Sequence, residues 1–243
     1  DGEFETEAWG PGARWAVDRA ATLCGERDDP SGFRPRERVL VDSLRRHPGI
    51  RMPRSEAVFE ALVHAVLLQK VPTDQGEASY RALVFGLGER APGPTRLWIP
   101  PPAQVLARTP YWKLHGFNVE RRRADVIITA ARSAKRLEET AGMDREAASA
   151  RLQAFPGVGP WTAAKVAQVA LGDADAVQVG DFHLPHMVGY AFDGTARSTD
   201  ERMLELLEPY RGHRARVIRL LILAGVSPPR FGPRLSLTDI RSS

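Results

Sequence analysis

Residue types that could do chemistry are concentrated in a turn in the second half of the sequence. Residues 152–164 read Leu-Gln-Ala-Phe-Pro-Gly-Val-Gly-Pro-Trp-Thr-Ala-Ala. Because Gly157 allows a tight backbone turn and Pro160 suits the first turn of a helix, we predict a helix, a hairpin and a second helix. The amides of Gly157 and Gly159, uncovered by side chains at a helix N-terminus, could bind an anion such as a phosphate. An ordinary tight turn between two helices, without a ligand, is the alternative interpretation.

A carboxylate follows the second helix of this hairpin, in the stretch Val-Gly-Asp-Phe-His at residues 179–183. An Asp that follows a Gly and precedes a helical segment is a good N-cap, and this role alone would explain Asp181. An ionised carboxylate held at a fixed position can also stabilise a positive charge that develops in a reaction, and it can orient or deprotonate water. We therefore keep both roles for Asp181, the cap and the catalytic carboxylate.

The order of these residues resembles the helix-hairpin-helix DNA glycosylase superfamily, and within it the bacterial 3-methyladenine DNA glycosylase II branch, over residues from about 35 to 226. The resemblance implies a base-excision repair enzyme that flips a damaged base out of double-stranded DNA and hydrolyses its N-glycosidic bond. Asp181 would then stabilise the positive charge on the sugar and activate water. The residues that would bind DNA at the hairpin are Gly157, Val158, Gly159 and Thr162.

The residue directly after the hairpin bears on the reaction type. Superfamily members that also cut the DNA strand carry a lysine nucleophile there, whereas this sequence has Trp161. The resemblance therefore implies a monofunctional glycosylase in which water is the nucleophile. The predicted base pocket consists of Trp161, Phe182, His183, Lys165 and Arg219. Lys165 and Arg219 replace aromatic residues of this branch, and two cations would repel a cationic alkylated base. An alkylated base is the expected substrate, with a neutral oxidised or deaminated base as the alternative.

A base-flipping enzyme also needs a side chain that fills the gap left in the DNA. The loop 68–73 lies where relatives place this wedge, and the candidates are Gln69, Lys70 and Val71. An ordinary polar helix end is the alternative. In the family, backbone carbonyls of the hairpin hold a structural monovalent cation, and the matching positions are Gln153, Phe155 and Val158. The resemblance implies no cofactor for catalysis.

The elements that must position these residues are almost all helical. Apolar residues recur at helical spacing in residues 14–24, 58–69, 120–137 and 217–223, and a further helix is expected at 103–108. Residues 3–8 are compatible with one remnant strand, and the Pro- and Gly-rich residues 91–102 predict a linker or surface loop. Together with the resemblance, this pattern predicts an all-α fold of two helical lobes with a DNA-binding cleft between them.

We divide the chain into four parts. Residues 1–50 are an N-terminal segment that packs on the core, and residues 51–137 are a helical lobe with the base-flipping loop. Residues 138–226 are the helix-hairpin-helix lobe with Asp181, and residues 227–243 are a loosely held C-terminal tail. Because the sequence begins without Met, we also expect a preceding segment, which could include a sheet domain.

Composition limits the class of protein. The single cysteine, Cys24, excludes an internal disulfide and a four-cysteine metal or iron–sulfur site, and it favours a reducing compartment. No apolar run approaches the ~18 residues of a membrane span, so we expect no membrane partner. Together with the cysteine usage, the resemblance implies a monomeric bacterial cytoplasmic protein that is associated with the nucleoid. The net charge of +4 fits nucleic acid, but an arginine-rich composition explains it equally well. Two other functions stay open: a non-catalytic helix-hairpin-helix clamp on DNA, and a helical scaffold for a protein or small molecule.

Overall fold

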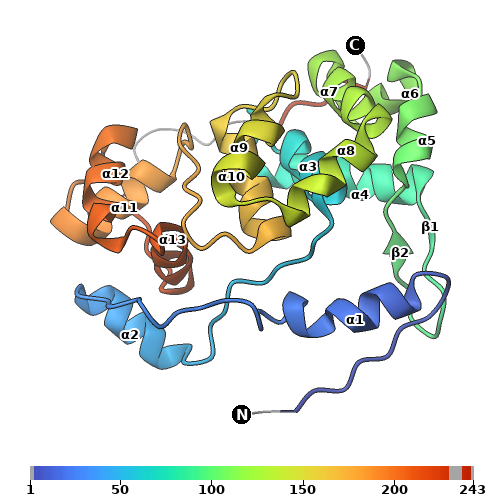
Figure 1. Cartoon of the computed structure of the whole chain (residues 1–243). Helices are drawn as coiled ribbons and strands as arrows, with labels where there is room; N and C mark the ends of the chain where they lie inside the picture. Colours follow the sequence, from blue (N-terminus) through green and yellow to red (C-terminus); the bar gives the residue numbers. More distant parts are fainter. Residues whose placement is uncertain (1–2, 230–236, 242–243) are drawn as a thin grey trace.

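The computed structural model describes residues 3–229 and 237–241. Its helices form two lobes, each with its own hydrophobic core (Figure 1). The first lobe is built from residues 58–171, and the second lobe from α2 (Arg38–Arg46) together with residues 184–223. The predicted all-α fold of two lobes is confirmed, with one small two-stranded sheet added to it.

The first lobe contains most of the helices. Its elements are α3 (Val58–Leu67), α4 (Thr73–Leu87), β1 (Glu89–Arg90), β2 (Trp98–Ile99), α5 (Ala103–Arg108), α6 (Tyr111–His115), α7 (Arg121–Arg132), α8 (Ala134–Glu138), the 3-10 turn η1 (Glu139–Gly142), α9 (Arg145–Gln153), α10 (Pro160–Val166) and the π-helical turn η2 (Ala167–Leu171). The predicted helix at 103–108 has the bounds expected for it, whereas the helix predicted at 120–137 is interrupted at Ser133.

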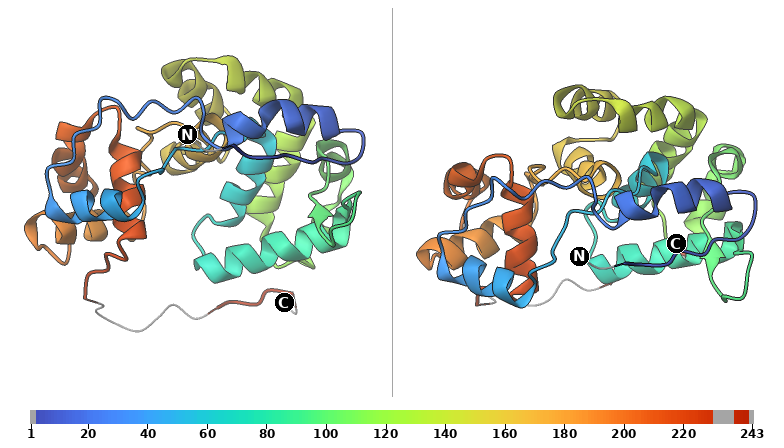
Figure 2. Two further views of the ribbon diagram at one scale, coloured as in Figure 1. Left: turned by 90° about the horizontal axis from the view of Figure 1, so that it is seen from below. Right: turned by 60° about the horizontal axis from the view of Figure 1, so that its bottom comes forward.

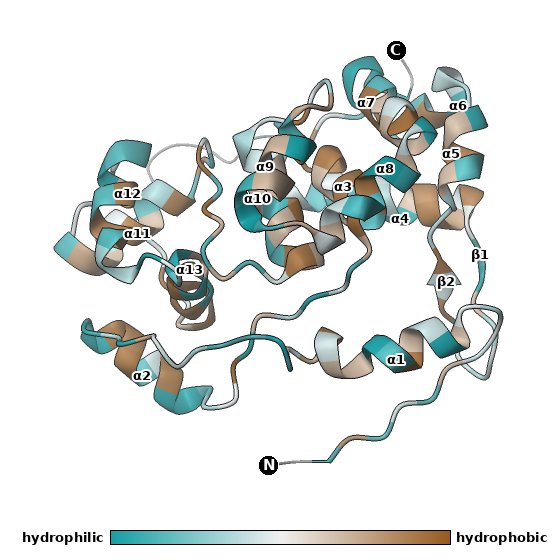
Figure 3. Cartoon of the chain, viewed as in Figure 1, coloured by the Kyte–Doolittle hydropathy of each residue, from teal (hydrophilic) through white to brown (hydrophobic). Residues whose placement is uncertain are grey.

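Helix α3 forms the centre of the first lobe. It is hydrophobic on nearly all sides, as a helix surrounded by other helices must be (Figure 3). Glu138 of α8 caps its start by accepting hydrogen bonds from the backbone N–H groups of Val58 (3.0 Å) and Phe59 (2.9 Å). The buried Arg123 of α7 caps its end by donating to the Leu67 carbonyl (2.8 Å). Because unpaired backbone groups at a buried helix end are costly, these bonds fix α3 and the start of the loop that follows it.

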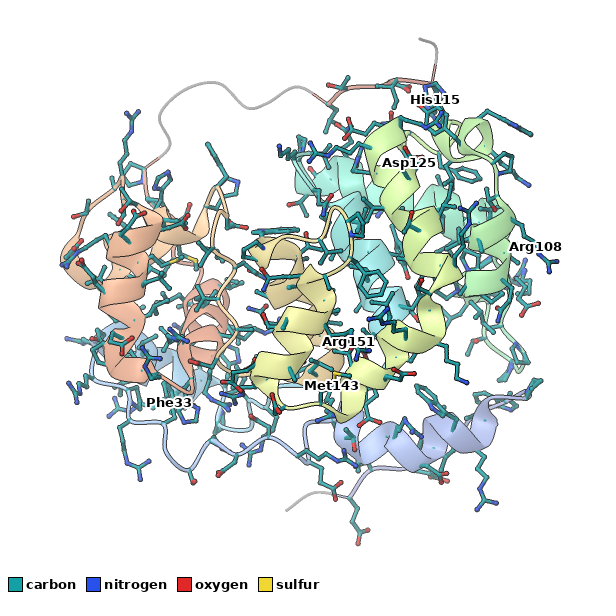
Figure 4. The ribbon with its side chains drawn as sticks, turned by 45° about the horizontal axis from the view of Figure 1, so that its top comes forward. Phe33, Arg108, His115, Asp125, Met143 and Arg151 are labelled. Carbon is teal, nitrogen blue, oxygen red and sulfur yellow. The ribbon has the colours of Figure 1, made fainter. Side chains whose placement is uncertain are left out.

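The second lobe packs around α13 (Arg214–Leu223). The other elements after the hairpin are α11 (Leu184–Asp193), α12 (Asp200–Leu207) and the 3-10 turn η3 (Glu208–Tyr210). The side-chain view in Figure 4 shows Phe33 beside these helices, whereas Arg151 of α9 lies in the first lobe. The Phe33 ring contacts the rings of Tyr210 and His213, with centroids 5.8 and 5.6 Å apart. The N-terminal segment therefore contributes to the core of the second lobe.

The boundary between the two cores does not fall at residue 138, where the sequence analysis divided the chain. Both helices that flank the hairpin bury side chains in the core of the first lobe, for example Leu152 of α9 and Val166 of α10. Helix α2, from the N-terminal segment, joins α11–α13 in the second core. Helices of seven to nine residues, such as α9 and α10, are too short to form a core alone. Helix α10 therefore packs against α3, and α9 packs against α10 and η1.

One expectation for the N-terminal half needs correction. Residues 3–9 contain no strand, in contrast to the remnant strand considered for residues 3–8. The strands that the described residues do contain, β1 and β2, lie at the ends of the Pro- and Gly-rich stretch and pair with each other, with Glu89 opposite Ile99. After residues 3–9, the chain forms α1 (Ala13–Leu23), which lies beside the first lobe (Figure 2).

The described part of the C-terminal tail is held by specific hydrogen bonds. The N–H of Thr238 donates to Gln75 Oε1 (3.0 Å), and its carbonyl accepts from Asn118 Nδ2 (3.0 Å). The N–H of Ile240 donates to Asn118 Oδ1 (2.9 Å). These hydrogen bonds attach residues 237–241 to the first lobe, whereas the sequence analysis expected a loosely held tail. Within the two described ranges, every helix is too short or too polar to cross a lipid bilayer.

Candidate active site

Asp181 lies where the chain enters the second lobe, and both of its carboxylate oxygens are engaged. Oδ1 accepts hydrogen bonds from the backbone N–H groups of His183 (2.8 Å) and Leu184 (3.0 Å), so Asp181 caps α11. Oδ2 accepts a hydrogen bond from Trp161 Nε1 (2.8 Å). Three N–H donors therefore hold the half-buried carboxylate in one orientation.

The turn before Asp181 is shaped by Gly180. Its φ of +87° lies in the left-handed region, where a side chain would strain the backbone. Its N–H donates to Asp200 Oδ2 of α12 (2.9 Å). The carboxylate is thus supported by its own helix and by the next helix of the second lobe.

Trp161 connects this carboxylate to the first lobe. It stands in the first turn of α10, directly after the hairpin, and its ring is half-buried. Because α10 packs in the core of the first lobe and α11 in that of the second, the hydrogen bond from Trp161 to Asp181 joins the two lobes. The candidate site therefore lies at the junction of the lobes, where a cleft was expected.

Lys165 lies one helical turn beyond Trp161, on the same side of α10. Its Nζ is 5.7 Å from the centroid of the Trp161 ring, a cation–π distance. Burial lowers the pKa of Lys165, while the negative charges of Asp181 and Glu77 act in the opposite direction. An amine that is partly desolvated and close to the carboxylate site can donate a hydrogen bond to a molecule bound there.

The hairpin is tied to the loop after α3. Gln69 Nε2 donates to the Gly157 carbonyl (3.0 Å) and to Thr162 Oγ1 (2.8 Å), so the amide of Gln69 bridges the two segments. Thr162 and the side chain of Val158 are buried beneath the hairpin. Lys70, the next residue of the loop, is exposed and has a φ of +55°, which is uncommon for a residue with a side chain.

Comparison with known proteins agrees with this geometry. No family model matches the sequence. The chain is 34% identical over 141 residues to the probable bifunctional transcriptional activator/DNA repair enzyme AlkA of Mycobacterium tuberculosis, which covers 56% of this chain and 28% of that protein. It is 30% identical over 173 residues to DNA-3-methyladenine glycosylase 2 of Escherichia coli, covering 68% of this chain and 58% of that protein. The chain thus spans less than two thirds of the length of these relatives.

The fold is similar to that of a solved structure, the 3-methyladenine DNA glycosylase from Archaeoglobus fulgidus. The TM-score is 0.71 at 21% sequence identity, and the match covers 88% of this chain and 76% of that chain. In sequence and in fold, the chain is similar to these DNA glycosylases. In sequence it is similar to the 3-methyladenine DNA glycosylase II branch, which the order of residues around the hairpin also indicated.

In this helix-hairpin-helix protein, the residues proposed for the base pocket lie in different surroundings. Trp161 and Lys165 lie together beside Asp181. Phe182 is 73% exposed, and its ring stacks edge-on against the exposed His183, with centroids 5.0 Å apart. Arg219 is exposed on α13, whereas its neighbour Arg216 is buried.

The carbonyls expected to hold a monovalent cation lie at the end of α9 and in the hairpin. Phe155 O accepts a hydrogen bond from the Val158 N–H (3.0 Å), which closes the turn. Gln153 is the last residue of α9. Among the described residues, no group of three or more His, Cys, Asp or Glu side chains could hold a metal ion.

Sequence reasoning missed several residues near this site. A pocket of about 380 Å³ is lined by Lys165 together with Glu60 and His64 of α3, Tyr80 of α4 and Trp15 of α1. Glu60 and His64 are the only polar residues of the ten in α3, and they stand four residues apart. Two polar residues on one face of an otherwise apolar helix were the available signal.

The hairpin geometry predicts unequal effects of two glycine substitutions. Gly157 has a φ of +84°, and a Cβ there would overlap Val126 Cγ2 of α7. Gly157→Ala should therefore lower the free energy of unfolding by about 2 kcal/mol and weaken duplex DNA binding. Gly159→Ala is the matched control for stability, because its φ of −94° is ordinary and nothing lies within 4 Å of an added Cβ. Urea unfolding and fluorescence anisotropy measure the two effects; equal stabilities of the two variants would contradict the prediction.

Proposed function

We propose that the chain is a DNA glycosylase of base-excision repair, which flips a damaged base out of double-stranded DNA and hydrolyses its bond to deoxyribose. The observation that carries this proposal is the orientation of Asp181, whose carboxylate receives three N–H donors at the junction of the lobes. An ordinary helix cap needs only the bonds from His183 and Leu184. The third bond, from Trp161 of the other lobe, is what a cap alone does not explain.

The proposed chemistry follows from the charge of this carboxylate. Breaking an N-glycosidic bond builds positive charge on the sugar, and a fixed negative charge beside the sugar stabilises that transition state. Asp181 would also orient or deprotonate the attacking water. Trp161, which occupies the position of the lysine nucleophile in strand-cutting relatives, supports water as the nucleophile and a monofunctional enzyme.

The DNA backbone would be held by the hairpin. The amides of Gly157, Val158 and Gly159 precede α10, whose N-terminal dipole favours a phosphate, and Thr162 supports the hairpin through Gln69. A monovalent cation bound to the carbonyls of Gln153, Phe155 and Val158 would strengthen that contact. The proposed enzyme needs no cofactor for catalysis, and we propose that it acts as a cytoplasmic monomer.

For the wedge that replaces the flipped base, we favour Lys70. The amide of Gln69 is already used in holding the hairpin, and Val71 is half-buried. Lys70 is exposed in the same loop and has a left-handed backbone conformation. It could fill the gap in the duplex with its aliphatic part and contact a phosphate with its amine.

A panel of damaged duplexes tests the proposed activity. Duplexes that each carry one alkylated, deaminated or oxidised base are incubated with the protein and then treated with alkali. We expect at least one of them to release its base and to break only after alkali, because hydrolysis by water leaves an intact abasic site. Breakage before alkali would contradict the monofunctional reaction. Salt-dependent duplex binding without any base release would instead favour the alternative, a non-catalytic DNA clamp.

A further inference from the structure

The pocket beside Lys165 is large enough for a nucleobase and is lined by parts of the chain that are distant in sequence. Its volume of about 380 Å³ lies in the range of small-molecule binding sites. One wall is α1, through Trp15 and Leu23, and the opposite side is formed by α3, Tyr80 and the α10–η2 face. The views of Figure 2 show α1 alongside the helices of the first lobe.

Lys165 connects the pocket to the candidate catalytic site. Lys165 lines it, and so does Val169, one turn further along the same helical face. Trp161, one turn earlier on that face, is in contact with both Lys165 and Asp181. A nucleotide whose sugar lay at Asp181 could therefore place its base past Trp161 and into this pocket.

The lining of the pocket contains both a hydrogen-bond donor and an acceptor. The half-buried Lys165 amine, next to Trp161, is a donor. Glu60 provides an acceptor, and Tyr80 Oη donates to its Oε1 over 3.4 Å. Burial raises the pKa of Glu60, so a neighbour that donates a hydrogen bond would be favourable for it. His64 also lines the pocket, with its Nε2 2.9 Å from Glu77 Oε1 and its ring against that of Tyr80.

The rim of the pocket adds positive charge. Arg19 of α1, which lines the pocket, forms an ion pair with Glu56 (2.9 Å). The same carboxylate also pairs with Arg27 and Arg54, both at 3.1 Å. Three guanidinium groups around one carboxylate leave an excess of positive charge around Glu56, and of these three groups Arg19 lines the pocket together with Lys165.

We propose that this pocket binds the flipped base and selects a neutral purine with a carbonyl acceptor for Lys165 and an N–H donor for Glu60. Deaminated and oxidised purines have this pattern and are neutral, whereas 7-methylguanine has the same groups and a positive charge. This assignment rests on the proposed glycosylase function and adds the class of its substrate. A cationic base in this pocket would lie near the Lys165 ammonium, and the two positive charges would repel each other.

Single-turnover excision from three duplexes tests the assignment. They contain hypoxanthine, 8-oxoguanine or 7-methylguanine, of which only the last is cationic. We expect the wild-type protein to release one of the neutral bases at least about tenfold faster than 7-methylguanine, since a charged hydrogen bond contributes about this factor. Lys165→Met should reduce that ratio by about tenfold, and Glu60→Leu should slow release of the neutral base. Lys113→Met, on the exposed surface of α6, is the matched control and should leave the ratio unchanged.

The possible failures are distinguishable. Faster wild-type release of 7-methylguanine, or a ratio that Lys165→Met does not change, would overturn the assignment and leave the glycosylase function standing. Release of no base from any duplex would overturn both. If borohydride traps a covalent complex with DNA in the wild-type protein but not in Lys165→Met, Lys165 is an amine nucleophile and the role given to it here is wrong. Circular dichroism of each variant checks that the fold is retained.

Discussion

Asp181→Asn is expected to reduce base release by about 10²- to 10³-fold while leaving the fold and duplex binding intact. The reason is that the substitution removes the negative charge that would stabilise the sugar cation and activate water. The shape of the side chain and its position between the lobes hardly change.

The local structure around position 181 should tolerate this change. Asn is as good an N-cap as Asp, and its carbonyl oxygen can still accept from the N–H groups of His183 and Leu184. The lost interaction is the hydrogen bond from Trp161, because the amide group of Asn would meet the indole N–H donor. A loss of activity with an unchanged unfolding transition therefore reports on charge rather than on folding.

The measurement compares single-turnover base release and duplex affinity for the wild-type protein, Asp181→Asn and a matched control. Asp193→Asn makes the same chemical change at the other end of α11, where Asp193 pairs with Arg202 on the surface (3.1 Å). We expect this control to keep full activity. If Asp181→Asn released bases at the wild-type rate, Asp181 would be a helix cap without a catalytic role.

Asp28→Ala is expected to lower the free energy of unfolding by about 3–5 kcal/mol, the cost of breaking a buried ion pair. Arg216 of α13 and Asp28 form this pair, and their side chains are only 1% and 3% exposed. Arg216 Nη1 donates to Asp28 Oδ2 over 2.8 Å, and the same oxygen accepts from the N–H of Met52 (3.0 Å). The carboxylate thus connects the N-terminal segment, the second lobe and the chain leading to the first lobe.

The large expected cost comes from the partner that stays behind. Without Asp28, the guanidinium of Arg216 would be a buried charge whose remaining side-chain contact is His213 Nδ1, at 3.3 Å from Nε. Burial and the nearby positive charge of Arg216 lower the pKa of His213, so this imidazole stays uncharged and can accept that bond. One neutral acceptor does not replace a carboxylate.

Urea unfolding of single and double variants measures this effect. Asp42→Ala removes a carboxylate from an exposed i,i+4 pair with Arg38, and it should change stability by less than about 0.5 kcal/mol. The double variant Asp28→Leu with Arg216→Met, which leaves neither charge behind, should regain a large part of the stability lost in Asp28→Ala. Equal effects of Asp28→Ala and Asp42→Ala would show that the buried pair does not hold these segments together.

Much of the site could be predicted from the sequence where conformation depends on neighbouring residues. Gly157 needs a positive φ and Pro160 begins a helix, so the hairpin follows from residue types within a few positions. The same holds for Asp181, which caps α11 through the N–H groups two and three residues later. Local backbone preferences act over this distance and are encoded directly in the chain.

The tertiary structure decided which side chains meet. Lys165 and Arg219 were equivalent in the sequence, two cations at helical positions that aromatic residues were expected to occupy. In the fold, Lys165 contacts Trp161 and lines the pocket, whereas Arg219 is exposed on α13. Which face of a helix is covered depends on the helices packed against it, and residue spacing alone does not specify them.

The pocket is the clearest example of a feature that residue spacing does not specify. Trp15, Glu60, Tyr80 and Lys165 come from four separate helices, and no local pattern links them. They are brought together because α3 must bury nearly all of its surface, which gathers α4 and α10 around it, while ion pairs of Glu56 with Arg19, Arg27 and Arg54 attach the end of α1. The sequence by itself determined the hairpin and the carboxylate; long-range packing decided the pocket beside them, because burial of apolar surface is satisfied only by the whole chain.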